Sequence, residues 1–236
     1  MSFPGLKTTP KLASRPRPQY TSGRWDNWDM IVSHKHKFIF IKTKKTSGTS
    51  VEVDLNRVLG PDDVATPIMP PVAGHQPQNF AFKKFGFIPK RFANHMPAAK
   101  VKKLVGDQVF NDYFVFCIER EPVDKCISYY SMLKKSPDHN KGHDDLTWDA
   151  YLELGEFPLD TFRYVGAQGE LLVDQILRYE TLAEDLKTVG DRLGFEVQLK
   201  SKAKAGFRQD VPVSDAQKQF IYDAFASSNT FTGYTL

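Results

Sequence analysis

Short apolar runs alternate along this chain with segments in which apolar residues recur at helical spacing. Residues 37–41 form a β-branched and aromatic run of strand length, and residues 51–59 then show helical spacing. The same order returns at residues 112–118, an apolar run that is followed by Pro122 and a second helical pattern. Residues 172–179 are a third strand candidate. Strands that alternate with helices predict an α/β domain with a mainly parallel central sheet flanked by helices.

Capping patterns predict where three later helices begin. A Ser or Thr followed three residues later by Glu or Gln forms a capping box, in which the two side chains bond to the backbone at the helix start. Thr181 with Glu184 and Ser214 with Gln217 both show this pattern. Thr147 stands directly before a further segment of helical spacing. We therefore expect helices to start at these three hydroxyl residues.

The loop after the first predicted strand carries a phosphate-binding pattern, Lys-Thr-Lys-Lys-Thr-Ser-Gly-Thr-Ser at residues 42–50. Such a loop between a strand and a helix offers free backbone N–H groups to an anion, and the helix dipole adds partial positive charge. Gly48 permits close approach of the backbone, and Lys45, with Lys42 and Lys44 as alternatives, supplies a full charge. The hydroxyls available for hydrogen bonds are those of Thr46, Ser47, Thr49 and Ser50.

A second anion-binding pattern follows the second predicted strand. Arg120 ends that strand, and Ser128 lies eight residues later in the helix that Pro122 opens. A long guanidinium group and a hydroxyl at this spacing can converge on one phosphate. Taken alone, Arg120 is also explained by an ion pair with a neighbouring carboxylate. Two such patterns in one chain predict a nucleotide-like ligand with two separated phosphates.

Together, the two loops resemble those of the sulfotransferases that use 3′-phosphoadenosine 5′-phosphosulfate (PAPS). The first loop of that family typically reads Pro-Lys-Thr-Gly-Gly-Thr-Ser and binds the 5′-phosphosulfate. Residues 44–50 match it, with Lys44 in place of the proline and Ser47 in place of the first glycine. The first loop thus agrees with the family at five of these seven positions.

The second loop of the family reads Arg-Asp/Asn-Pro, two residues, Arg, two residues, Ser, and binds the 3′-phosphate. Residues 120–128 match it, except that Glu121 replaces Asp or Asn and Lys125 replaces Arg. Further similarity lies in residues 94–98, 177–186 and 231–234. The resemblance spans roughly residues 35–236 and is closest to the branch that contains carbohydrate sulfotransferases.

The resemblance implies a P-loop-like domain that transfers a sulfuryl group from PAPS to an acceptor hydroxyl of a carbohydrate or a small metabolite. The product of the donor is 3′-phosphoadenosine 5′-phosphate (PAP), and no metal is required. Transfer needs a base for the acceptor and charge stabilisation on the leaving phosphate. We expect Lys45 to stabilise that charge and His95 to be the base, with Glu52 as the rival base. The other expected cofactor contacts are Arg120 and Ser128 at the 3′-phosphate and Arg208, with Lys202 and Lys204, in a lid-like loop.

The formal charge of +4 comes from one end of the chain. Residues 1–25 hold five basic and no acidic residues, and the remainder, with 27 basic and 28 acidic residues, has a formal charge of −1. We therefore interpret residues 1–33 as a basic, Pro-rich arm that is flexible or loosely docked. Residues 34–236 are interpreted as one sulfotransferase-like α/β domain, for which this length is sufficient.

Several protein classes are disfavoured by the sequence. No run of about 18 apolar residues is present and the N-terminus lacks an apolar signal core, which predicts no membrane association and a cytoplasmic protein, or one from which an anchor was removed. Cys117 is interpreted as a buried strand thiol and Cys126 as a helix thiol, rather than as a disulfide. The histidines lack a third clustered metal ligand. The body of the chain has no net basicity or recognised motif that would indicate a nucleic-acid partner.

Two other functions stay open at this point. A kinase could use the same loops with a nucleoside triphosphate, although the Walker A order and the kinase motifs are missing. A non-catalytic nucleotide- or anion-binding module would need no base, and its basic arm would contact a partner. Residues 60–94, rich in Pro, Gly and Phe, and the loop at residues 134–148 are the segments expected to line an acceptor site.

Overall fold

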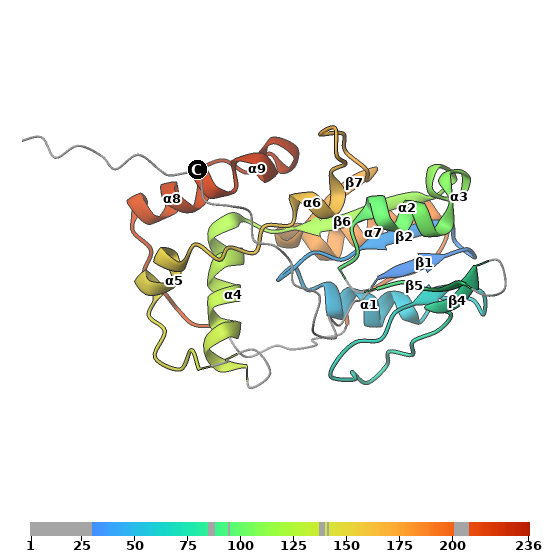
Figure 1. Cartoon of the computed structure of the whole chain (residues 1–236), viewed down its shortest axis with the longest axis horizontal. Coiled ribbons are helices and arrows are strands. Elements are labelled where there is room, and N and C mark those ends of the chain that lie inside the picture. The colour runs from blue at the N-terminus through green and yellow to red at the C-terminus, as the bar shows by residue number, and fades with distance from the viewer. Residues whose placement is uncertain (1–29, 85–87, 94, 137–139, 141, 201–207) are drawn as a thin grey trace, which may run out of the picture.

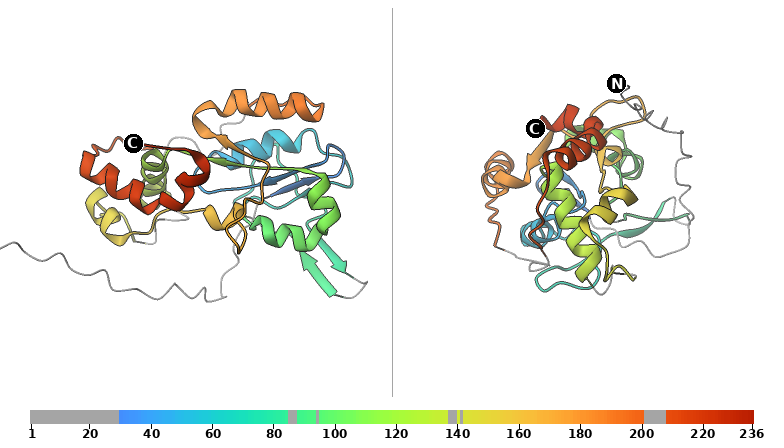
Figure 2. Two further views of the ribbon diagram at one scale, coloured as in Figure 1. Left: turned by 90° about the horizontal axis from the view of Figure 1, so that it is seen from above. Right: turned by 90° about the vertical axis from the view of Figure 1, so that its left-hand side faces the viewer.

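The computed structural model of the chain describes residues 30–84, 88–93, 95–136, 140, 142–200 and 208–236. A five-stranded sheet in the order β3-β1-β2-β6-β7 forms its centre, and helices lie on both faces of this sheet (Figures 1 and 2). The predicted α/β class is therefore confirmed. None of the helices in the described part of the chain is both long enough and apolar enough to span a bilayer.

The sheet is mixed rather than mainly parallel. Its strands are β1 (Ile31–Ser33), β2 (Phe38–Ile41), β3 (Val64–Ala65), β6 (Phe114–Glu119) and β7 (Gln175–Arg178). β6 runs parallel to both β2 and β7, whereas β1 is antiparallel to both β2 and β3. The prediction of a mainly parallel sheet is thus wrong for the β1 side. The reason is the short turn at residues 34–37, which reverses the chain at once, whereas a parallel connection needs a crossover of a dozen or more residues.

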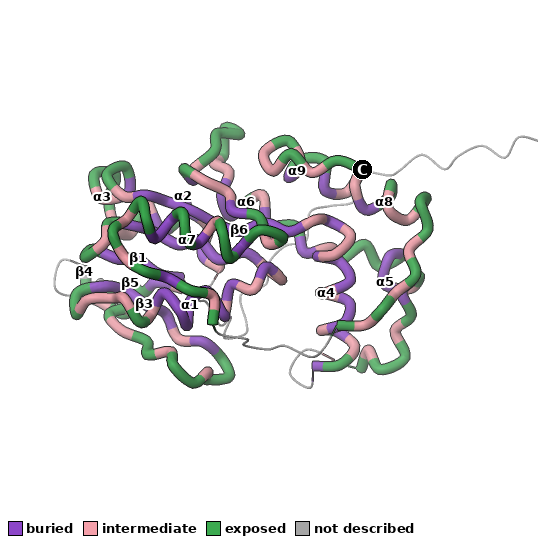
Figure 3. The backbone as a smooth tube through the Cα atoms, turned by 180° about the vertical axis from the view of Figure 1, so that it is seen from behind, coloured by how far each residue is buried: buried purple, intermediate pink, exposed green. Residues whose placement is uncertain are grey.

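Alternate residues of the central strands enter two separate cores. Phe38, Phe40, Phe114 and Phe116 face the core that contains α1 (Gly48–Asn56) and α7 (Leu182–Leu193). Ile39, Ile41, Val115 and Cys117 face the core that contains α2 (Ala98–Val105), α3 (Asp107–Asp112) and α6 (Thr161–Tyr164). Because both faces are covered, β2 and β6 read in the sequence as continuous apolar runs. Figure 3 shows this buried centre beneath helices with exposed outer surfaces.

A third, helical core lies beside the end of the sheet at which β2 and β6 finish (Figure 1). It joins α4 (Pro122–Lys135), α5 (Trp148–Leu154) and α8 (Asp215–Ala224), with α9 (Ala226–Thr232) next in the chain. Aromatic rings form its centre, among them Tyr130, Trp148 and Tyr151. In this helical core, the N-terminus of α4 lies next to the carboxyl end of β6.

All three helices start at the predicted hydroxyl residue, and the expected side-chain capping bond forms at two of them. Thr147 accepts a bond from Ala150 at the start of α5, and Ser214 forms the complete capping box of α8. At α7 the expected box is absent. The chain forms a 3₁₀ turn, η1 (Tyr179–Thr181), and the Thr181 hydroxyl bonds to the carboxylate of Asp185 instead of the backbone.

Residues 60–94 contain no helix among their described positions, as predicted, but they do contain an antiparallel hairpin of β4 (Ala81–Lys84) and β5 (Ile88–Arg91). The folded domain also begins earlier than expected. Residues 31–33, which we assigned to the basic arm, form β1 between β2 and β3. Ile31 and Val32 of this strand are fully buried, so it is part of the folded domain. Residues 1–29 lie outside the described part of the chain.

Candidate functional site

The first predicted phosphate loop connects β2 to α1. Lys45 and Ser47 adopt left-handed backbone angles, with φ of 62° and 59°. Left-handed residues beside helical ones turn successive N–H groups toward a common point, which is the backbone form of an anion-binding concavity. Ser47 directly precedes α1, so the start of the helix faces the same point. Both Lys45 and Ser47 are half-buried.

Lys42 serves the interior of this loop. Its Nζ lies 2.7 Å from Glu52 Oε2 and 3.1 Å from Thr49 Oγ1, and both Lys42 and Glu52 are buried. Gly48 makes room for the Lys42 stem, because a Cβ at this position would lie 2.7 Å from Lys42 Cγ. Glu52, predicted as the rival base, is thus the partner of a buried lysine.

The loop hydroxyls divide into two groups. The Thr46 hydroxyl lies 3.0 Å from that of Thr43, which in turn donates to the carbonyl oxygen of Ile118 in β6. These two threonines therefore tie the loop to the neighbouring strand. Ser50 is buried, whereas Ser47 and Thr49 are half-buried. Of the predicted hydroxyl ligands, those of Ser47 and Thr49 are the more accessible.

Arg120 joins the second predicted motif to the first. It follows the last residue of β6, and its Nη1 donates to the carbonyl oxygen of Lys45 over 3.0 Å. Its Nε donates to Asp124 Oδ2 over 2.5 Å, and its guanidinium group stacks 3.9 Å above the centre of the Tyr179 ring. Arg120 therefore has the carboxylate partner that we considered from the sequence, and also bridges the two loops.

A second cation shares that carboxylate. Arg208, which is half exposed, forms an ion pair with Asp124 Oδ1. Two guanidinium groups thus face one carboxylate, so these three side chains together carry one positive charge. Ser128 is half-buried on α4, two turns beyond Arg120. Glu121, which departs from the sulfotransferase pattern, caps α4 by accepting bonds from two backbone N–H groups. Lys202 and Lys204 lie outside the described residues.

A buried ion network lies beneath these loops. Lys125 is fully buried, and its Nζ lies 2.6 Å from Glu119 Oε2 and 3.0 Å from Asp160 Oδ2. Asp160 Oδ2 also accepts a bond of 2.7 Å from the backbone N–H of Lys44, and its Oδ1 pairs with Arg163 Nε at 2.5 Å. Glu119, Asp160 and Arg163 were not found from the sequence, because their pairing joins segments that share no local pattern.

Charge within this network is unequally distributed. Burial alone would raise the pKa of Asp160, but the charges of Lys125 and Arg163 outweigh it and hold that pKa well below its usual range. For Glu119, burial outweighs Lys125, and the pKa is raised. Burial would lower the pKa of Lys125, but Asp160 and Glu119 raise it instead. Asp160 is therefore the firmly ionised carboxylate of the pair.

His95 meets the first loop from the segment before α2. Its Nδ1 lies 3.0 Å from the carbonyl oxygen of Lys42. A carbonyl oxygen only accepts, so Nδ1 carries the proton and Nε2 keeps its lone pair. The backbone oxygen of His95 accepts a bond from Arg163 Nη1. Burial and then the charges of Lys42 and Arg163 lower the pKa of His95 well below 6.5, so that the ring is neutral at pH 7.

The cysteines and the possible metal ligands were also considered from the sequence. Cys117 and Cys126 are free thiols, as predicted. Both are buried, and burial raises the pKa of Cys126 to about 12. Within the described ranges, no group of three or more His, Cys, Asp or Glu side chains could hold a metal ion.

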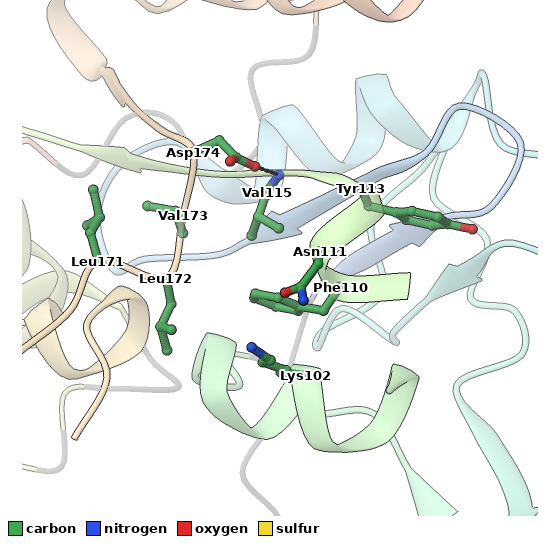
Figure 4. Close-up of a pocket in the computed structure, with 9 residues that line it drawn as sticks. All are labelled: Lys102, Phe110, Asn111, Tyr113, Val115, Leu171, Leu172, Val173 and Asp174. Atoms are coloured by element: carbon green, nitrogen blue, oxygen red, sulfur yellow. Dashed lines mark hydrogen bonds between the residues drawn. The ribbon is translucent and has the colours of Figure 1, made fainter. Parts of the chain in front are cut away.

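A pocket of about 270 Å³ lies at the opposite, amino end of β6 (Figure 4). Lys102 and Phe110 line it from the side of α2 and α3, and residues 171–174 close it from the other. Asp174 is already used there, because its Oδ2 accepts a bond of 2.7 Å from the backbone of Val115. None of the predicted site residues lines this pocket.

Comparison with known proteins gives a relationship but no activity. No family model matches the chain, and no solved structure does. The chain is 30% identical over 115 residues to an uncharacterized protein of Archaeoglobus fulgidus. The alignment covers 44% of this chain and 87% of the archaeal protein. The chain therefore belongs to the same family as this archaeal protein.

Proposed function

We propose that this protein is a sulfotransferase with a P-loop-like domain that moves a sulfuryl group from PAPS to an acceptor hydroxyl. The observation that carries the proposal is the 3.0 Å bond between Arg120 Nη1 and the carbonyl oxygen of Lys45. It joins the two motifs at the carboxyl ends of adjacent parallel strands, where ligands bind in open α/β sheets. This arrangement supports one ligand with a phosphate at each loop.

The residues at the two loops suit an anionic donor. The left-handed turn at Lys45 and Ser47 suits the 5′-phosphosulfate, and the charge excess of Arg120 and Arg208 over Asp124 suits the 3′-phosphate. PAPS would supply the sulfuryl group, with PAP as the product. Ser128 is the hydroxyl that would assist at the 3′-phosphate, and no metal enters the proposal.

His95 is the proposed base. With Nδ1–H bonded to the Lys42 carbonyl, Nε2 can take the proton of the acceptor hydroxyl as the new oxygen–sulfur bond forms and the sulfur–oxygen bond to the leaving phosphate breaks. Lys45 would stabilise the negative charge that develops on the bridging oxygen of that phosphate. Glu52 is disfavoured, because it would have to give up its ion pair with Lys42 before accepting a proton.

The acceptor is proposed to be a hydroxyl of a carbohydrate or a small metabolite. Residues 64–106, which contain His95, hold seven Lys and Arg residues and no Asp or Glu. These residues extend from the β4–β5 hairpin to α2, whose Lys102 lies at the amino end of β6, so their charge attracts negatively charged molecules to this side of the protein rather than to the base itself. This charge supports an acceptor that itself carries acidic groups.

Binding of PAP tests the cofactor class without any knowledge of the acceptor. A ligand at about 100 times its Kd stabilises a protein by roughly 2.7 kcal/mol, which corresponds to a Tm increase of about 5 to 11 °C for a domain of this size. We expect this increase with PAP in the wild type, a much smaller one with AMP, and its loss in Arg120→Ala.

Arg192→Ala is the matched control. Arg192 also stacks on an aromatic ring, at 4.1 Å from Phe114, but at the amino end of β6. This variant should keep the full response to PAP. A wild type that ignores PAP, or that responds more strongly to ATP with Mg²⁺, would overturn the sulfotransferase proposal and favour a kinase.

A further inference from the structure

Asp160 receives hydrogen bonds from three separate parts of the chain. Its fully buried carboxylate binds the backbone N–H of Lys44 in the first loop, Nζ of Lys125 in α4 and Nε of Arg163 in α6, at 2.7, 3.0 and 2.5 Å. It directly precedes α6, yet its side chain makes no capping bond to that helix. The carboxylate therefore joins the first loop and α4 to the Arg163 side chain of α6, and makes no capping bond to the backbone of that helix.

The bonds from Asp160 form a closed path between the first loop and His95. Arg163 binds Asp160 through Nε and the backbone oxygen of His95 through Nη1. The His95 ring returns to the loop through Nδ1 and the Lys42 carbonyl. One carboxylate oxygen thus holds the loop at Lys44 while the other, through Arg163, holds the histidine.

We infer that Asp160 is a positioning residue that fixes the orientation of His95 relative to the first loop. The inference rests on the proposed function for its catalytic meaning, but its structural content concerns the His95 ring alone. His95 has a left-handed backbone, with φ of 50°, which a histidine adopts only when neighbouring groups hold it there. The charged groups that face it are Lys42, Arg163 and Asp160.

Both carboxylate oxygens are needed for this role. Asparagine has one acceptor oxygen and one NH₂ group, so Asp160→Asn would turn a donor toward either the Lys44 N–H or the Arg163 guanidinium group. It would also leave two buried cations with Glu119 as the one carboxylate of the network. The bond to the Lys44 N–H or the bond to Arg163 would be lost, and His95 would lose its fixed position relative to the first loop.

Nuclear magnetic resonance of ¹⁵N-labelled histidine rings tests the inference without any substrate. In the wild type we expect His95 to give one set of signals with the proton on Nδ1. In Asp160→Asn the ring should populate both tautomers. Arg163→Lys, which keeps the charge but cannot reach both partners, should act in the same way and serves if Asp160→Asn does not fold. Unchanged His95 signals in either folded variant would overturn the inference.

Asp63→Asn is the matched control. Asp63 is also a buried carboxylate that accepts backbone bonds, from His34, Lys35 and Gly60, but it directly precedes β3, on the far side of the sheet's β1 strand from β2. Its replacement should lower stability and leave the His95 signals unchanged. Loss of the tautomer preference in this control as well would show a general loosening and would contradict a specific role for Asp160.

Turnover separates positioning from a merely structural role. If Asp160 acts through His95, Asp160→Asn should lower kcat by roughly 10- to 100-fold when His95 is present. When His95 has already been replaced by Ala, the same substitution should lower kcat by less than about threefold. Equal losses in both backgrounds would overturn the inference. A wild type that neither binds PAP nor transfers sulfate would instead overturn the proposed function, and the ring signals would still decide the role of Asp160.

Discussion

Neighbouring lysines of one loop have different surroundings. Lys42 is buried against Glu52 and supports the loop from within, whereas Lys45 is half-buried at the left-handed turn. The sequence places both in the same basic cluster and cannot separate them, because burial depends on the stem of Lys42 passing beside Gly48. Lys45, the residue predicted to stabilise the leaving group, thus differs from Lys42 in being only half-buried.

Lys45→Ala should therefore abolish most turnover without unfolding the protein. Removal of one group that stabilises transition-state charge costs about 10²- to 10³-fold in kcat. The Tm should change little, since a half-buried side chain is lost. Sulfate transfer from PAPS would be measured beside Lys103→Ala, an exposed lysine of α2 that should keep normal turnover. Full activity in Lys45→Ala would exclude the assigned role.

Gly48→Ala should destabilise the loop through a steric conflict. The new Cβ would lie 2.7 Å from Lys42 Cγ, and overpacking of this kind costs about 1 to 3 kcal/mol. Urea denaturation would measure the loss. In a Lys42→Ala background the conflicting atoms are gone, so the same substitution should cost much less. A cost that is the same in both backgrounds would point to the backbone of Gly48 instead.

The pH dependence of kcat/KM should reflect the surroundings of His95. A base is active when it is deprotonated, and the pKa of His95 lies well below 6.5 because of burial and the charges of Lys42 and Arg163. The rate should therefore stay level from pH 8 to pH 6.5 and fall only at lower pH. A pH–rate profile with an acid limb centred near 6.5 or above would contradict this environment for the base.

At the scale of elements, the sequence predicts strands and helix starts that depend on neighbouring residues. The apolar runs that became β2 and β6 were recognised, as were Pro122 at the start of α4 and the cap of α5. The three-residue strand β1 was missed because it is too short to show a period, and residue 112 proved to end α3 instead of starting a strand. The bonds of Asp160 to Lys44 and Lys125 cross between elements, so no local pattern predicts them.

The junction of β6 and α4 depends on the charge of Lys125. Lys125→Met would leave Glu119 and Asp160 buried without this cation, and removal of one partner from a buried pair costs about 3 to 5 kcal/mol. Lys125→Arg, which introduces the residue found here in the sulfotransferase pattern that the sequence resembles, should cost less because it keeps the charge. Chemical denaturation of both variants tests this. Equal losses would assign the effect to packing of the side-chain stem.

At the scale of the whole molecule, the mixed sheet separates two tasks. Its parallel strands β2, β6 and β7 end together and carry the candidate site, whereas β1 and β3 extend the sheet on the other side. The helical core of α4, α5 and α8 lies beyond the strand ends, and α4 carries both Lys125 and Asp124, the carboxylate that binds Arg120. The candidate site therefore lies between the sheet and the helical core, and the bonds of Lys125 in α4 to Glu119 and Asp160 join the two.

The domain boundary can be tested by shortening the chain. A chain that begins at Met30 should keep the sheet, whereas one that begins at His34 should not fold, because it lacks the strand that pairs with both β2 and β3. Met30, Ile31 and Val32 are fully buried, and each such side chain contributes about 1.5 to 3 kcal/mol. Their sum approaches the roughly 5 to 15 kcal/mol that stabilises a typical domain. Circular dichroism melts of the two chains would decide, since a cooperative transition in the shorter one would show that β1 is dispensable.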